Sequence, residues 1–69
     1  MITKEELLEI GFIELDENDF TFGKKNKINV YDDELSVVDI FVAGHWIEVP
    51  NATTIQDIED LIRLFNFEK

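Results

Sequence analysis

The chain has 69 residues, of which 45% are hydrophobic and none is cysteine, so it suffices for one small domain without disulfides or thiolate metal sites. Sixteen acidic residues against six basic ones give a formal net charge of −10, which opposes direct binding to nucleic-acid phosphates and to anionic membranes. We therefore expect a soluble, cytoplasmic domain spanning residues 1–69, with neither a membrane span nor a signal peptide.

The first predicted element is a short helix over residues 2–10. Thr3 is a candidate N-cap, and Glu6 three residues later completes a capping-box pattern. Gly11 follows as a helix-ending glycine, with Phe12 placed to pack back on the last turn. A helix of about eight residues is unstable alone, so its apolar side chains must dock on another element.

Short apolar or alternating stretches between residues 12 and 31 predict three strands of an antiparallel meander. Polar segments rich in Asp, Asn, Gly and Lys separate them and are typical of turns. The predicted strands are residues 12–15, 20–22 and 28–31, and the predicted turns are residues 16–19, 23–27 and 32–34.

The longest apolar stretch, residues 35–49, predicts a β-hairpin at the centre of the sheet. Ala43 and Gly44 interrupt it, and the glycine supplies the positive φ that a tight turn needs. Pro50 has no N–H for a strand ladder and ends the second strand. Because side chains alternate across a strand, one set faces the core. This inner set is Val38, Ile40, Val42, His45, Ile47 and Val49.

A second helix is predicted after Thr53 and Thr54 and extends to about residue 65. Both threonines are candidate N-caps, since Gln56 and Asp57 follow them by three residues. Apolar residues recur at helical spacing and form a stripe that packs on the sheet. The sequence thus predicts an α+β fold: an N-terminal helix, an antiparallel meander of four to five short strands and a C-terminal helix on the sheet. The residues expected to be buried together are Val38, Ile40, Val42, Ile47, Ile58, Leu61, Ile62 and Phe65.

Residues that could support catalysis are scarce. His45 is the only histidine, and no partner that would orient its imidazole is evident; Ser36 is the only serine and lies in no nucleophile motif. The acidic turns lack the ligand spacing and glycine of a calcium loop, and the lysine-rich turn lacks the glycine spacing of a phosphate loop. We therefore expect no enzymatic activity, no catalytic residue, no metal site and no cofactor.

The outer face of the predicted hairpin mixes large rings with carboxylates. Exposed aromatic residues ringed by charge are typical of protein-binding patches. If both helices cover the opposite face, this patch is open; if one helix covers each face, its rings belong to the core. The predicted binding residues are Phe41, Trp46, Val37, Asp39, Glu48 and Tyr31.

The opening TKEELLEIGF, the β-meander and the closing TIQDIEDLIRLF resemble those of small proteins encoded by bacteriophages and prophages. The resemblance covers most of the chain. It implies that the protein acts in a phage setting, but it assigns no activity and no functional residue to this chain. Small acidic phage proteins are frequently inhibitors that occlude a host defence enzyme, and some mimic the charge of DNA.

Two functions follow from these observations. The first is a non-enzymatic binding module, a phage accessory protein or anti-defence inhibitor, that docks on a protein with a basic surface through its acidic surface and aromatic patch. The alternative is a structural or accessory protein that forms a homodimer through the sheet face or edge. The acidity also keeps a small protein soluble, so it does not by itself choose between them.

Overall fold

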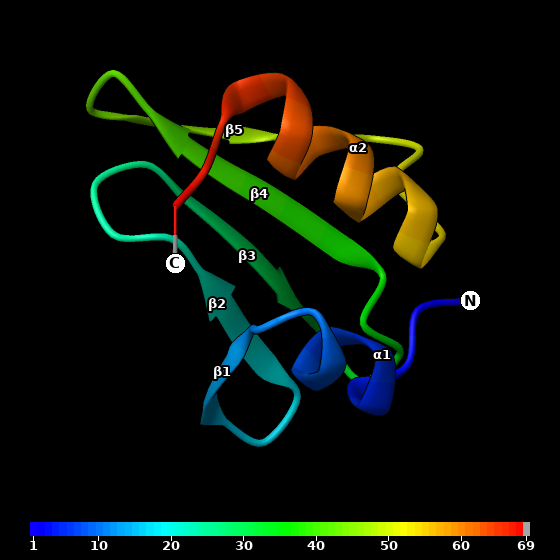
Figure 1. Cartoon of the computed structure of the whole chain (residues 1–69). Helices are drawn as coiled ribbons and strands as arrows, with labels where there is room; N and C mark the ends of the chain where they lie inside the picture. Colours follow the sequence, from blue (N-terminus) through cyan, green and yellow to red (C-terminus); the bar gives the residue numbers. More distant parts are fainter. Residues whose placement is uncertain (69) are drawn as a thin grey trace.

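The computed structural model describes residues 1–68 and contains a five-stranded antiparallel sheet with one helix before it and one after it along the chain (Figure 1). The strands neighbour one another in chain order, so the sheet is a meander and the predicted α+β fold is confirmed. Neither helix of the described chain is long and apolar enough to cross a membrane. The elements are α1 (Lys4–Glu9), β1 (Ile13–Asp16), β2 (Asp19–Phe22), β3 (Lys27–Tyr31), β4 (Val37–Val42), β5 (His45–Glu48) and α2 (Ile55–Phe65).

Helix α1 is shorter than predicted but has the expected caps at both ends. The Thr3 hydroxyl accepts the Glu6 N–H at 3.2 Å, and the Glu6 carboxylate accepts the Thr3 N–H at 2.9 Å, which is a complete capping box. At the other end the Phe12 N–H donates to the Leu7 carbonyl at 3.0 Å, as in a Schellman motif. These bonds satisfy backbone groups at both ends of the six-residue helix. Leu7 and Phe12 are buried in the core.

Helix α2 begins with Thr54, and not Thr53, as its N-cap. The Thr54 hydroxyl accepts the Asp57 N–H at 3.2 Å. In return the Asp57 carboxylate accepts the N–H groups of Thr53 and Thr54 at 2.9 and 3.1 Å. These backbone bonds favour the ionised carboxylate and hold the pKa of Asp57 below its ordinary value. The helix ends where Asn66 adopts a left-handed conformation, with φ of 56°.

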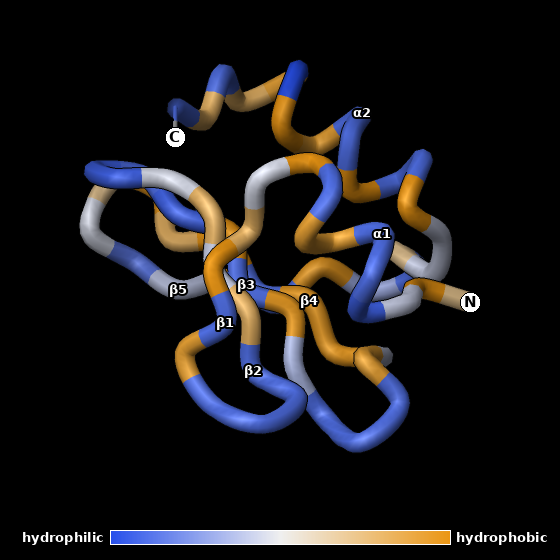
Figure 2. The backbone as a smooth tube through the Cα atoms, turned by 60° about the horizontal axis from the view of Figure 1, so that its bottom comes forward, coloured by the Kyte–Doolittle hydropathy of each residue, from blue (hydrophilic) through white to orange (hydrophobic). Residues whose placement is uncertain are grey.

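Both helices lie on one side of the sheet, and Figure 2 shows them together above it. The fully buried Leu7 of α1 and Ile58 of α2 belong to the same hydrophobic cluster as the inward side chains of the central strands. Those inward side chains are Phe20, Phe22, Ile28, Val30, Val38 and Ile40. No helix of the described chain therefore covers the outer face of the sheet.

The prediction that Ile47 and Phe65 are buried is wrong. Ile47 is 51% exposed and Phe65 is 37% exposed, because the last turns of α2 stand away from β5 and leave a groove between them. Val42, Leu61 and Ile62 are partly buried against the cluster, whereas Val38, Ile40 and Ile58 are buried as predicted.

Candidate functional site

The candidate site is built on the hairpin of β4 and β5. A two-residue turn joins these strands, with φ of 53° at Ala43 and 80° at Gly44, and two positive φ angles define a type I′ turn. This turn matches the right-handed twist of the strands and fixes their register. The register places Phe41 opposite Trp46.

The Phe41 and Trp46 rings are in contact on the outer face. The Val49 N–H donates to the Val38 carbonyl at 2.8 Å, and hydrogen-bonded pairs alternate along an antiparallel ladder. Phe41 and Trp46 are therefore a pair without backbone bonds, in which side chains come closest. Their ring centroids are 5.0 Å apart and the rings are tilted by 49°. Trp46 nevertheless remains 52% exposed.

Carboxylates border this aromatic pair. Asp39 lies opposite Glu48, two pairs further along β4 and β5 and on the same face, with the inward pair of Ile40 and Ile47 between. The Tyr31 hydroxyl donates to the Asp39 carboxylate at 2.8 Å, and this bond to a negative acceptor raises the pKa of Tyr31 above its ordinary value. Val37 lies opposite Tyr31 and completes the set. We call these six residues, Tyr31, Val37, Asp39, Phe41, Trp46 and Glu48, the aromatic patch.

The structure adds outer-face neighbours that were not predicted as site residues. Lys27 lies opposite Phe41, and Asn29 lies opposite Asp39. The Thr21 hydroxyl donates to the Asn29 side-chain carbonyl at 2.6 Å. The alternation of Ile28 and Val30 toward the core is the sequence signal that would have placed Lys27 and Asn29 on this face.

On the other side of the same hairpin lies the groove that exposes Ile47 and Phe65. It has a volume of about 610 Å³ and a nearly continuous apolar lining. Leu61 and Phe65 of α2 form one wall, and Val42 and Ile47 of the hairpin form the other. His45 stands at its rim and is exposed, so the only histidine is a sheet-edge residue.

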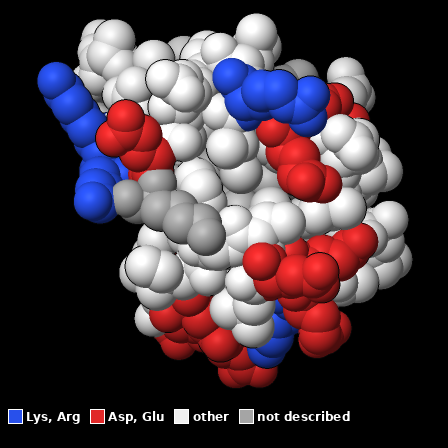
Figure 3. All heavy atoms as spheres, viewed as in Figure 1, with Lys and Arg blue, Asp and Glu red and all other residues white. Residues whose placement is uncertain are grey.

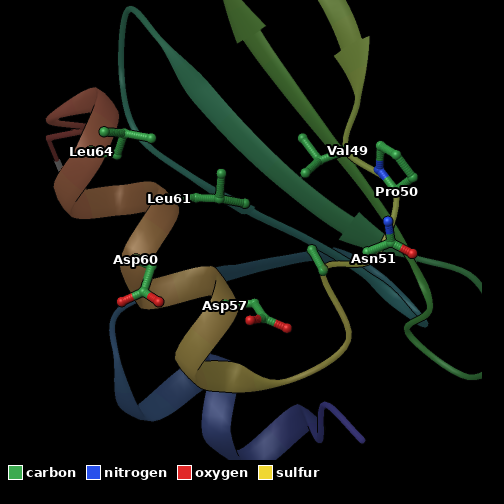
Figure 4. Close-up of a pocket in the computed structure, with 8 residues that line it drawn as sticks. Val49, Pro50, Asn51, Asp57, Asp60, Leu61 and Leu64 are labelled. Atoms are coloured by element: carbon green, nitrogen blue, oxygen red, sulfur yellow. The ribbon is translucent and has the colours of Figure 1, made fainter.

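A smaller cleft of about 220 Å³ continues from this groove between α2 and the segment after β5 (Figure 4). Leu61 and Leu64 face Val49 and Pro50 there. Its two carboxylates already have partners in the chain. Asp57 caps α2, and Asp60 accepts hydrogen bonds from Gln56 and Arg63. Within residues 1–68 no group of three or more His, Cys, Asp or Glu side chains is arranged to hold a metal ion.

Acidic side chains dominate the surface. On the face drawn in Figure 3, Asp and Glu gather over α1 and the β1–β2 turn, and the fewer Lys and Arg side chains lie beside acidic ones. A surface of one predominant sign attracts molecules of the opposite sign over distances longer than a contact. The charge is therefore a property of the whole molecule, and the aromatic patch is a local feature within it.

A scan of the chain against protein-family models, a search of curated proteins and a search of solved structures each found no significant match.

Proposed function

We propose that the protein is a non-enzymatic binding module whose aromatic patch docks on a protein partner with a basic surface. The contact between Phe41 and Trp46, on a sheet face that neither helix covers, is the observation that carries this proposal. Exposed aromatic side chains anchor interfaces because they bury large apolar areas at little conformational cost.

The acidic residues have a different role in this proposal. A net charge of −10 steers a basic partner toward the module and raises the association rate more than the affinity. Asp39 and Glu48 border the aromatic pair, where rim charges set orientation. The anchor therefore determines how long a complex lasts, and the charge determines how fast it forms.

The resemblance to small phage proteins gives the proposal a setting. We propose an accessory protein or anti-defence inhibitor that acts in the cytoplasm and occludes a basic, nucleic-acid-handling surface of its partner. The support is the acidic composition together with the exposed Trp46, whose ring packs on the partly buried Phe41. In this proposal the described residues act by binding and covering the partner's surface, and none of them has a catalytic role.

Trp46→Ala tests the anchor. Partner capture from lysate, measured in low and in high salt, should fall by at least about thirtyfold, which corresponds to an interface anchor of about 2 kcal/mol. The melting temperature should change little, because Trp46 is half exposed. Leu8→Ala is the matched control, since Leu8 is 46% exposed on α1 and lies away from both the patch and the groove. A collapse of melting in Trp46→Ala alone would place the indole in the core and remove the patch as a site.

The competing function is self-association. The observation that favours it is the position of β5 at the sheet edge, with Trp46 exposed on one side of the strand and Ile47 on the other. Sedimentation equilibrium distinguishes the two functions. A monomer over the whole concentration range supports a separate partner, and a dimer that Trp46→Ala dissociates supports self-association.

A further inference from the structure

We propose that β5 receives a sixth strand: an extended segment of the basic partner that pairs antiparallel with its free edge. This inference rests on the proposed binding function and specifies the part of the partner that binds. The segment has alternating apolar and basic side chains. Its apolar side chains enter the groove beside α2, and its basic side chains lie over the aromatic patch.

The backbone of β5 offers donors and acceptors to such a strand. Its one neighbour in the described sheet is β4. Because the Val49 N–H bonds to β4, the alternation of the ladder directs the N–H and C=O groups of His45 and Ile47 toward β4 as well. The same groups of Trp46 and Glu48 point away from β4, to the free edge. Strand addition uses such groups for affinity and the alternate side chains for specificity.

The two faces of β5 define the side chains of the added strand. On the inner face, Ile47 and Phe65 border an apolar groove large enough for aliphatic side chains. On the outer face, Trp46 offers an aromatic ring to a cation, and Glu48 offers a carboxylate. An alternation of apolar and basic residues satisfies both faces at once.

The opposite edge of the sheet is protected and β5 is not. The pairing of β1 with β2 shifts register between Glu14 and Asp16, and a bulge of this kind blunts an edge. The Lys4 ammonium also lies 3.8 Å from the Glu14 carboxylate, which ties α1 to that edge. Ile13 and Leu15 of β1 are also exposed, but β5 differs in pairing with β4 in an unbroken register and in lying beside the apolar groove.

Charge selects a basic partner over a second copy of the chain. Pairing two β5 edges would bring together two chains that each have a net charge of −10. Like charges at close range oppose association, whereas a cationic segment is attracted by the same field. The charge of this chain therefore complements a basic strand.

The probe is an acetylated and amidated peptide, Lys-Val-Lys-Val-Lys-Val, titrated into the whole protein. Trp46 is the only tryptophan, so its fluorescence reports binding directly. Hydrogen exchange of the Trp46 and Glu48 amides should slow on binding, since these amides face the free edge. The same peptide with Glu in place of Lys should not bind. Binding that leaves both amides unprotected would overturn strand addition.

Backbone methylation of the peptide gives a matched pair of controls. Directly opposite residues in an antiparallel pair share a face, so the lysines opposite Trp46 and Glu48 direct their own N–H groups toward β5. Methylation of the lysine amides should weaken binding by at least about tenfold, through lost hydrogen bonds and steric obstruction. Methylation of the valine amides blocks only the far edge and should leave affinity unchanged. Equal effects of the two methylations contradict the proposal.

Two variants test the protein side. Glu48→Pro removes an N–H that faces the free edge and leaves the β4 ladder intact, while Glu48→Gln removes only the charge. Peptide binding should be lost in the first and weakened in the second.

If Glu48→Pro captures the partner as well as Glu48→Gln does, while Trp46→Ala does not, strand addition is overturned and the proposed function stands. A dimer of the free chain that Glu48→Pro dissociates also overturns the proposal, since a second copy then occupies the edge.

Discussion

At the scale of single residues, the bond from the Tyr31 hydroxyl to the Asp39 carboxylate couples the aromatic patch to pH. Its effect on stability has a definite sign. The folded chain raises the pKa of Tyr31 above the value of about 10 in an unfolded chain. The contribution to stability is therefore fully present below the unfolded pKa and is lost as pH rises through the folded pKa.

Asp39→Asn should lower the pKa of Tyr31 toward its ordinary value, because it removes the charged acceptor. Tyr31 is the only tyrosine, so phenolate absorbance during an alkaline titration measures this pKa without overlap from other tyrosines. Glu9→Gln, which removes a carboxylate from α1, is the matched control and should leave the titration unchanged. A titration of Asp39→Asn that coincides with that of the unmodified chain would show that the hydrogen bond is absent in solution.

At the scale of elements, two turn glycines differ in what an added methyl group would contact. Gly23 and Gly44 both have positive φ, at 108° and 80°. A methyl group on Gly44 would extend into open space, whereas one on Gly23 would overlap the Asn26 carbonyl oxygen. Both φ values disfavour alanine, and at Gly23 the clash with the Asn26 carbonyl adds to the conformational cost.

Gly44→Ala should lower the free energy of unfolding by about 1 kcal/mol, which is the conformational cost alone. Gly23→Ala should cost more, because the turn between β2 and β3 must also shift away from the new methyl group. Urea unfolding of both variants measures the two costs on one scale. Equal midpoints would mean that the Asn26 carbonyl moves aside freely.

Local patterns in the sequence predict most of the elements and one face of the site. The spacing of Thr3 and Glu6 predicts the first cap, and the alternation around Ala43 and Gly44 places Phe41 and Trp46 on one face, as observed. These features depend on neighbours in the chain. The exposure of Ile47 and Phe65 depends instead on how closely α2 approaches β5, which periodicity does not encode. The groove was therefore beyond prediction from the sequence.

At the scale of the whole molecule, repulsion among carboxylates opposes the compact state. The net charge is −10, and the exposed ion pairs Lys4–Glu14 and Arg63–Asp60 offset little of it. Sodium chloride at about 1 M, where the Debye length is about 3 Å, should therefore raise the melting temperature. Glu9→Lys should raise it in low salt and reduce its dependence on salt. A melting temperature that falls as salt is added would show that attractive pairs outweigh the repulsion.

The meander also gives the molecule an electric polarity along its strands. Alternate turns of a meander lie at the same end of the sheet, so the acidic turns at residues 16–19 and 32–34 share one end. The lysine-rich turn at residues 23–27 shares the other end with the β4–β5 turn (Figure 1). Such a charge asymmetry orients an approaching molecule whose own positive charge is concentrated at one end, before any contact forms. We therefore expect the strand proposed to pair antiparallel with β5 to have its most cationic residues at its amino end, beside Glu48 and away from the lysines.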